Sequence, residues 1–113
     1  MMDRQNKKSL ATVLRHRVSI QAKTEALDSE NEHVETWNTV DSVWASVDPI
    51  KAVQQFENRS VGVDATHLIK VRGSTVVTEL NRIQFGTRNF EILTIENIQE
   101  RGVLKVITCK EVR

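Results

Sequence analysis

The strongest constraint on the fold is a run of alternating apolar and polar residues between positions 61 and 72. Every second place carries the same kind of side chain: Val61, Val63, Ala65, His67, Ile69 and Val71. Because successive side chains of a strand point to opposite faces, this period of two predicts a half-buried β-strand. Similar alternation or β-branched composition marks residues 18–22, 36–47, 76–80, 82–85, 89–95 and 103–109. These segments predict about six strands.

Helical periodicity occurs only once. Residues 48–49 are Asp-Pro, which is typical of the start of a helix because Asp caps free amides and proline needs no donor there. Ile50, Val53 and Phe56 then fall three apart, which predicts one apolar stripe packed on a sheet. The helix should end by Asn58. One short helix among about six strands predicts an all-β fold, a small β-barrel or sandwich.

Turns and irregularities can also be placed. Gly73-Ser74 ends the alternating run, Gly86 suits a hairpin turn, and residues 99–102 form a second turn. Phe90 and Ile92 share one strand face, whereas Leu93 and Ile95 share the other. Such a phase slip predicts a bulge or a strand buried on both sides. A break in the 36–47 strand is expected near residue 38 or 41.

Length and composition describe one domain. A chain of 113 residues with 39% apolar and 27% charged residues can bury one modest core. No stretch approaches the roughly 20 apolar residues that span a bilayer, and residues 1–9 are too polar for a secretory signal. The single cysteine, Cys109, excludes an internal disulfide, which favours a reducing cytoplasm or a particle assembled there. We expect a flexible basic arm, 1–13, and a barrel domain, 14–113.

Charge is distributed in two adjoining blocks, although the net charge is only +1. Residues 1–23 have a balance of +5, and 24–35 a balance of −5. The basic residues that could contact a partner are Arg4, Lys7, Lys8, Arg15 and Arg17, and the acidic ones are Glu25, Asp28, Glu30, Glu32 and Glu35. Opposite blocks suggest contact between neighbouring chains or with a polyanion, although two solvated, poorly ordered segments would give the same pattern. Residues 24–34 are expected to form a long acidic loop or a hairpin arm extended into solvent.

Two tryptophans, Trp37 and Trp44, stand seven residues apart in a chain without tyrosine. A platform for stacking bases would interleave such rings with Arg or Lys, and no basic residue lies between them. We therefore predict that both are structural. One would span the barrel, and the other would pack under the helix or a loop. The predicted aromatic core is Trp37, Trp44, Phe56, Phe85 and Phe90.

No catalytic, metal or cofactor motif is present. His67 lies on the apolar face of its strand and is expected to be a satisfied, partly buried ring, not a metal ligand. His16 and His33 have no metal-binding spacing, and Cys109 in an apolar strand is expected to be an inert core thiol. The residues thus predict a binding or assembly protein, not an enzyme, and no cofactor.

Several segments taken in order resemble the head-tail joining, or head-closure, family of long-tailed double-stranded DNA bacteriophages. They are "LRHRVSIQ" (14–21), "ETWNTVDSVWASVDP" (35–49) followed by a short helix with "QQFE", "THLIKVR" (66–72), "RIQFGTRNFEI" (82–92) and "LKVITCKE" (104–111). The match covers nearly all of residues 14–111. Two departures are the acidic first loop, where the family often has a Gly-rich tip, and Gly73, where it commonly has an aromatic.

The resemblance implies a structural virion protein at the neck, made in the host bacterial cytoplasm. Such a protein docks as a homo-oligomeric ring beneath the portal and extends or closes the DNA channel, and the resemblance allows a monomer as its free state. Its partners would be portal or adaptor proteins and tail proteins, with packaged DNA passing without sequence-specific binding and no membrane involved. The acidic segment would face the lumen or the tail, and the basic arm the portal or a neighbour. The alternatives are a tail terminator or other connector ring, and an OB-like single-stranded nucleic-acid-binding module.

Overall fold

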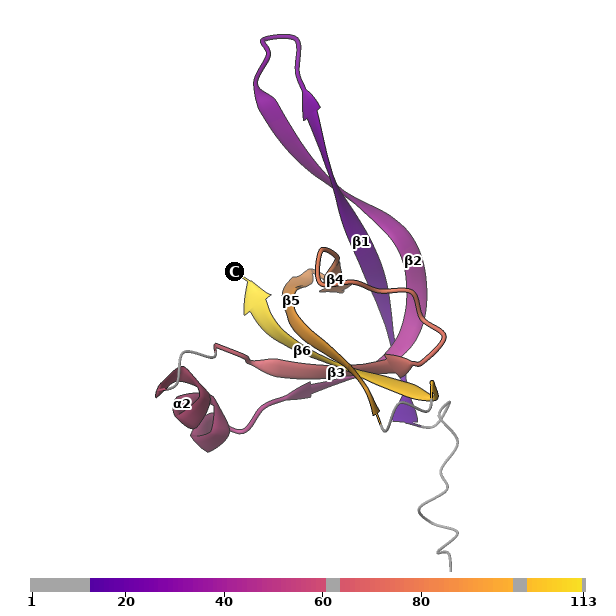
Figure 1. Cartoon of the computed structure of the whole chain (residues 1–113), viewed down its shortest axis with the longest axis vertical. Helices are drawn as coiled ribbons and strands as arrows, with labels where there is room; N and C mark the ends of the chain where they lie inside the picture. The colour runs from indigo at the N-terminus through magenta and orange to yellow at the C-terminus, as the bar shows by residue number, and fades with distance from the viewer. Residues whose placement is uncertain (1–12, 61–63, 99–101, 113) are drawn as a thin grey trace, which may run out of the picture.

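A computed structural model describes residues 13–60, 64–98 and 102–112 (Figure 1). Within them the chain forms six strands and one helix of nine residues. In chain order these are β1 (His16–Leu27), β2 (His33–Pro49), α2 (Ala52–Ser60), β3 (His67–Arg72), β4 (Arg82–Phe85), β5 (Arg88–Asn97) and β6 (Leu104–Val112). The predicted fold, all-β with one short helix, is confirmed. None of the helices in this part of the chain is long and apolar enough to cross a membrane.

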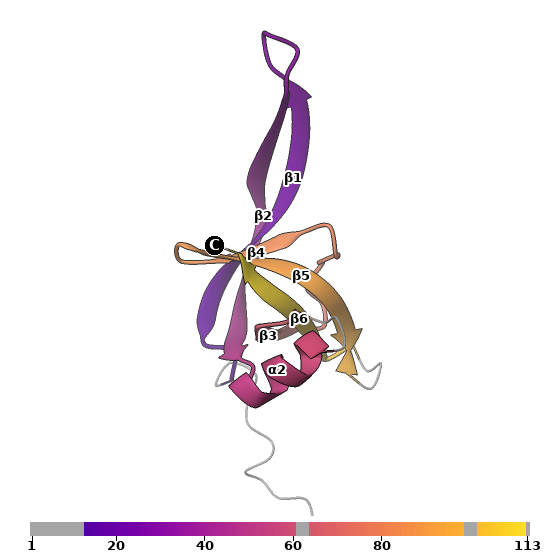
Figure 2. The same ribbon diagram turned by 90° about the vertical axis from the view of Figure 1, so that its left-hand side faces the viewer.

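The strands form a closed antiparallel barrel in the order β1-β2-β3-β6-β5-β4, and β4 pairs again with β1 (Figure 2). Closure satisfies the backbone groups of every strand over the barrel's height and removes free sheet edges there. The predicted hairpin turn lies between β4 and β5, where Gly86 has a φ of 62° that suits glycine. The expected turn near 99–102 lies partly outside the described residues.

Alternate residues of each strand fill the barrel. On β3 the alternation found in the sequence holds, because His67, Ile69 and Val71 are buried. The core side chains come from all six strands and the loop before β4: Val18, Ile20, Ala45, Ile69, Val71, Val77, Ile83, Phe90, Ile92, Ile107 and Cys109. Val61 and Val63, the first positions of the same run, lie outside the described residues.

Two bulges explain the irregularities of the sequence. The β1–β2 register shifts after Ile20, which pairs with Asp41 while Gln21 pairs with Thr39, so Val40 is the extra residue. The expected break near residue 38 or 41 is this bulge. On β5, Ile92 pairs with Cys109 and Thr94 with Thr108, which leaves Leu93 extra. The phase slip in 90–95 is therefore a bulge, as predicted.

Beyond the barrel, β1 and β2 continue as a two-stranded hairpin that projects well past the other strands (Figure 1). Residues 22–27 of β1 pair only with 33–38 of β2. The molecule extends 66 × 33 × 26 Å, and its radius of gyration of 16.3 Å exceeds the roughly 13 Å of a compact chain this long. Of the two possibilities for residues 24–34, a long loop is wrong and an extended hairpin is right.

The helix differs from its prediction. It begins at Ala52, not at Asp48-Pro49, because β2 continues through Pro49 in register with His67. It also projects from the side of the barrel (Figure 1), and Val53 and Phe56 are 72% and 70% exposed. The prediction that this stripe packs on the sheet, and that Phe56 belongs to the core, is wrong.

The segment between β3 and β4 also differs from expectation. Residues 76–80 form no strand, and Val76 and Leu80 are among the most exposed apolar side chains. The segment departs from the barrel after Gly73, whose N–H donates to the carbonyl of Val103 at 2.9 Å. A Cβ at Gly73 would overlap the carbonyl group of Gly102. This close approach explains why glycine, and not an aromatic residue, follows β3.

Candidate interaction surfaces at the two ends of the molecule

The tip of the hairpin is a turn held by one carboxylate. Asp28 Oδ1 accepts hydrogen bonds from the amides of Glu30 at 2.8 Å and Glu32 at 2.9 Å. The amide of Asp28 donates to the Glu32 carbonyl, and Asn31 adopts a φ of 63°, a left-handed conformation that Asn tolerates. One of the five predicted acidic residues, Asp28, therefore shapes the turn.

Two further carboxylates are paired within the hairpin. Lys23 Nζ lies 3.2 Å from Glu35 and 3.4 Å from Glu25. The hydrogen bonds to Glu35 and then Glu25 raise the pKa of Lys23. All three side chains are solvent-exposed, so these pairs add little stability. Among the described residues, Glu30 and Glu32 are then the members of the acidic set whose carboxylates have no protein partner.

The opposite end of the barrel is basic. There Leu14, Arg15, Trp44 and Arg72 line a cavity of about 340 Å³. Arg17 stands beside it, with its guanidinium carbon 5.2 Å from the Trp44 ring and its Nε donating to Ser42 Oγ at 3.0 Å. Neither this guanidinium nor those of Arg15 and Arg72 has an ion-pair partner among the described residues. We call Arg15, Arg17, Trp44 and Arg72 the basic cradle.

Trp44 is 50% exposed, so the prediction that it belongs to the core is wrong. The reason is the register of the ladder. Trp44 pairs with Arg17, and paired residues point to the same face of a sheet. Arg17 is exposed whereas the next residue, Val18, is buried, so Trp44 also points outward. Arg15 and Arg17 were predicted as contact residues, and the structure places them beside this ring. Arg4, Lys7 and Lys8, predicted with them, lie outside the described residues.

Trp37 lies at the foot of the hairpin and does not span the barrel. Arg82 covers its ring, with the guanidinium carbon 4.5 Å from the ring centroid, and also donates from Nε to Gln21 Oε1 at 2.6 Å. Trp37 and Arg82 line a groove of about 680 Å³ together with the exposed Leu80. Trp37 is half-buried, so it braces the hairpin against the β4 end of the barrel and does not belong to the central core.

Of the predicted core phenylalanines, Phe90 has 0% exposed surface, in agreement with the prediction. Phe85 is partly buried and packs against the core cluster. Its ring lies 5.0 Å from that of His16. The aromatic core is thus smaller than predicted, because strand register and the bulge at Val40, not residue type, decide which rings face inward.

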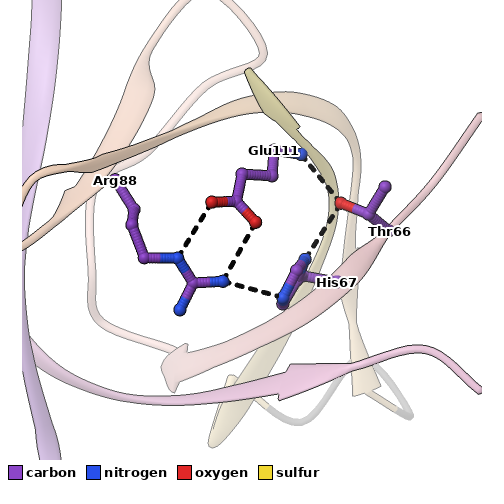
Figure 3. A network of polar contacts seen from close by, with 4 residues as sticks. All are labelled: Thr66, His67, Arg88 and Glu111. Atoms are coloured by element: carbon purple, nitrogen blue, oxygen red, sulfur yellow. Dashed lines mark hydrogen bonds and ion pairs between the residues drawn. The ribbon is translucent and has the colours of Figure 1, made fainter. Parts of the chain in front are cut away.

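A polar network ties the starts of β3 and β5 to the end of β6 (Figure 3). Arg88 donates two hydrogen bonds to Glu111, from Nε at 2.9 Å and from Nη2 at 3.0 Å. Arg88 Nη2 also lies 3.1 Å from His67 Nε2, and His67 Nδ1 lies 2.9 Å from Thr66 Oγ1. The Thr66 hydroxyl in turn accepts the amide of Glu111 at 2.8 Å.

These contacts define the state of His67. Since Arg88 can only donate, Nε2 must accept, and Nδ1 carries the hydrogen and donates to Thr66. Burial, and then the charge of Arg88, lower the pKa of His67, while Glu111 acts in the opposite direction. The ring also lies edge-on to Phe90 at 5.0 Å. His67 is therefore a hydrogen-bonded structural histidine with only 9% of its surface exposed, and the prediction of a satisfied ring is confirmed.

Cys109 is a core residue with no exposed surface, and its Sγ donates to the carbonyl of His67 at 3.4 Å. Burial raises its pKa to about 12, so the reactive thiolate is scarce at neutral pH, as expected of an inert thiol. In the part of the chain that the structure describes, no three His, Cys, Asp or Glu side chains gather as a metal site.

Comparison with known proteins identifies relatives of the whole domain. The family model described as phage head completion protein matches residues 10–112. Among solved structures, a protein of Shigella flexneri 2a, determined in solution, is 24% identical with a TM-score of 0.67; the alignment covers 87% of this chain and 92% of that one. A chain of a native gene transfer agent virion is 19% identical with a TM-score of 0.58, covering 88% and 96%. No curated protein matches. At these identities the structural neighbours establish the fold.

Proposed function

Because this chain belongs to the phage head completion protein family, we propose that it joins the phage head to the tail as one subunit of a ring. Membership makes it a structural protein of the virion in a non-enzymatic family. The finer proposal is that the ring docks at the neck on portal or adaptor proteins, extends or closes the DNA channel, and offers a platform to tail proteins. The family match over 10–112 is the observation that carries it.

The architecture suits a part that is inserted between larger bodies. A closed barrel resists deformation because every strand is paired on both sides, and the hairpin adds a narrow projection. The two ends of the molecule also differ in charge, acidic at the hairpin and basic at the cradle. A ring repeats each contact around its axis, so weak contacts of one subunit add up to a stable joint.

We propose that the hairpin faces the channel or the tail. Residues 24–35 have a charge balance of −5, and an acidic hairpin would repel the phosphates of DNA and let it slide past. The basic arm, 1–13, would order on the portal or on a neighbouring subunit, as charged segments often do on binding. The barrel domain, 14–113, would carry the ring.

Removal of the protein from the phage that encodes it tests the joining role. Under the proposal, particles made without it are DNA-emptied heads beside complete, unattached tails in electron micrographs. A tail terminator, the alternative connector role, would instead give tails of aberrant length. Complete, infectious particles in the absence of this chain would contradict both.

The hairpin and the arm are tested separately. Glu30→Gln with Glu32→Gln should lower DNA retention or infectious titre, while the matched exposed change Glu57→Gln on α2 should not. Deletion of residues 1–8 should weaken attachment to portal-bearing heads. Unchanged titre with both glutamates neutralised would remove the hairpin's role, and unchanged attachment without residues 1–8 would remove the arm's.

A further inference from the structure

The basic cradle has the composition of a docking site for a carboxylate-bearing segment. Arg15 and Arg72 line the same cavity as the half-exposed indole of Trp44, and the guanidinium of Arg17 lies against that indole. Arg forms bidentate pairs with carboxylates, and the guanidiniums of Arg15 and Arg72 have no hydrogen-bond or ion-pair partner among the described residues. Beside these charges, Leu14 and the indole give the small cavity an apolar floor. The fitting partner is therefore an acidic turn with an apolar residue next to it.

The same chain presents such a segment at its other end. At the hairpin tip the free carboxylates of Glu30 and Glu32 lie between two exposed apolar side chains, those of Leu27 and Val34. Leu27 is 58% exposed and Val34 is 42% exposed. Asp28 holds this turn in one shape through two amide hydrogen bonds, which reduces the entropy lost on docking. Tip and cradle are complementary in both charge and apolar content.

One molecule cannot make this contact with itself. Arg17 and Leu27 lie on the same continuous strand, ten residues apart, a separation of roughly 33 Å in extended geometry. Figure 1 shows the hairpin rising from one end of the barrel while β1 begins at the other. Contact between tip and cradle therefore requires two copies, arranged head to tail. Such heterologous contacts form a ring when the rotation between copies closes.

We propose that the hairpin tip of one subunit docks in the basic cradle of the next, with Glu30 and Glu32 opposite Arg15, Arg17 and Arg72. This contact rests on the ring assembly proposed above and assigns its surfaces. Nucleic acid fits the cradle less well. Single-stranded DNA sites stack successive bases on several aromatic rings, whereas here one indole is present and Arg17 already lies against it.

Cross-linking tests the contact with the full-length protein. Ser29→Cys places a thiol at the tip and Val13→Cys places one beside the cradle, and both positions are exposed. The native Cys109 is buried and should not react. A bifunctional maleimide should link the two variants to each other in a mixture, and should link either variant to itself much less. The link should decrease when salt is raised from about 50 to 500 mM.

Charge exchange makes the test specific. In the Ser29→Cys chain, Glu30→Lys with Glu32→Lys should reduce the link about tenfold, as should Arg15→Glu with Arg72→Glu in the Val13→Cys chain. Combining the two reversed chains should restore it. The controls are Glu57→Lys and Lys51→Glu, exposed charges of the α2 region that should leave the link unchanged.

Two results would overturn the proposal: no selective link between tip and cradle, or reversed chains that fail to restore each other. Tight binding of a labelled duplex DNA that is lost in Arg15→Glu with Arg72→Glu, without any tip-to-cradle link, would assign the cradle to nucleic acid instead. Circular dichroism of each variant verifies folding. If complementary reversal fails while particles lacking this chain still show unjoined heads and tails, only the docking contact is wrong and the joining role stands.

Discussion

Trp37 and Trp44 face the same side of the β1–β2 ladder although they stand an odd number of residues apart. They pair with Lys23 and Arg17, which are six residues apart on the uninterrupted β1, and the extra residue Val40 shifts the parity of β2 between them. An arginine lies against each ring, Arg82 at 4.5 Å and Arg17 at 5.2 Å. The bulge thus places both indoles on the same outer face of the ladder, where each packs against an arginine side chain.

Two phenylalanines give a matched test of where the core lies. Phe90→Ala should lower the free energy of unfolding by about 3–5 kcal/mol, because it empties a fully buried site. Phe56→Ala, at a residue 70% exposed on α2, should change it by less than about 0.5 kcal/mol. Urea unfolding of the two variants measures both. Similar losses would mean that α2 packs on the barrel after all.

Gly73 should tolerate no side chain. Gly73→Ala places a Cβ against the backbone of Gly102, and the overpacking should cost about 1–3 kcal/mol of unfolding free energy. Gly86→Ala is the control, because nothing lies within 4 Å of its Cβ position and its cost comes only from the positive φ, about 1 kcal/mol. Urea midpoints compare them. A smaller loss at 73 than at 86 would contradict the close approach.

His67 should make stability depend on pH. Its pKa is lowered in the folded state, mainly by burial, so the unfolded chain binds a proton first as pH falls. The stabilising contribution is complete above the unfolded pKa, about 6.5, and is lost as pH falls below it toward the lowered folded value.

Urea midpoints measured between about pH 7.5 and 5 should therefore fall in the wild-type chain. In His67→Gln the decrease should be smaller, although stability at pH 7.5 is also lower because the contacts to Thr66 and Arg88 change. An unchanged slope in His67→Gln would show that another group titrates.

Asp28 should be needed for the shape of the hairpin tip. Asp28→Ala removes the acceptor of two amide hydrogen bonds, so the amides of Glu30 and Glu32 should exchange with deuterium faster, by roughly 5- to 30-fold for about 1–2 kcal/mol of local stability. Asp28→Asn keeps an acceptor oxygen and should retain most of the protection. Equal exchange in the wild type and both variants would mean that the turn does not depend on this side chain.

Strand patterns could be read from the sequence where one face is buried and the other is solvated. In β3 the alternation of His67, Ile69 and Val71 with polar residues follows from side chains that point alternately into the barrel and to the solvent. The phase slip at 90–95 follows in the same way from the extra residue in β5. Both β3 and the β5 bulge were therefore predictable. The prediction of a strand at 76–80 failed because β-propensity measures how well a side chain fits a half-buried sheet surface, whereas Val76 is 79% exposed.

The candidate surfaces were only partly predictable. The acidic and basic blocks were visible in the sequence as charge. The sequence did not predict that Lys23 pairs with Glu25 and Glu35, or that the Asp28 carboxylate accepts the hydrogen bonds that hold the turn. Arg72 was missed altogether, because it joins Arg15 and Trp44 only through the pairing of β2 with β3. Contacts of this kind depend on which strands pair when the barrel closes, and the sequence around a single residue carries no signal of that pairing.

The continuity of β1 from the core to the hairpin tip has a mechanical consequence. A sideways force on the tip would bend the arm about its foot, because residues 22–27 pair with β2 alone and no third strand supports them. A pull along the strand axis would instead act on many barrel hydrogen bonds at once. The projection would therefore be compliant to transverse forces and stiff to axial ones.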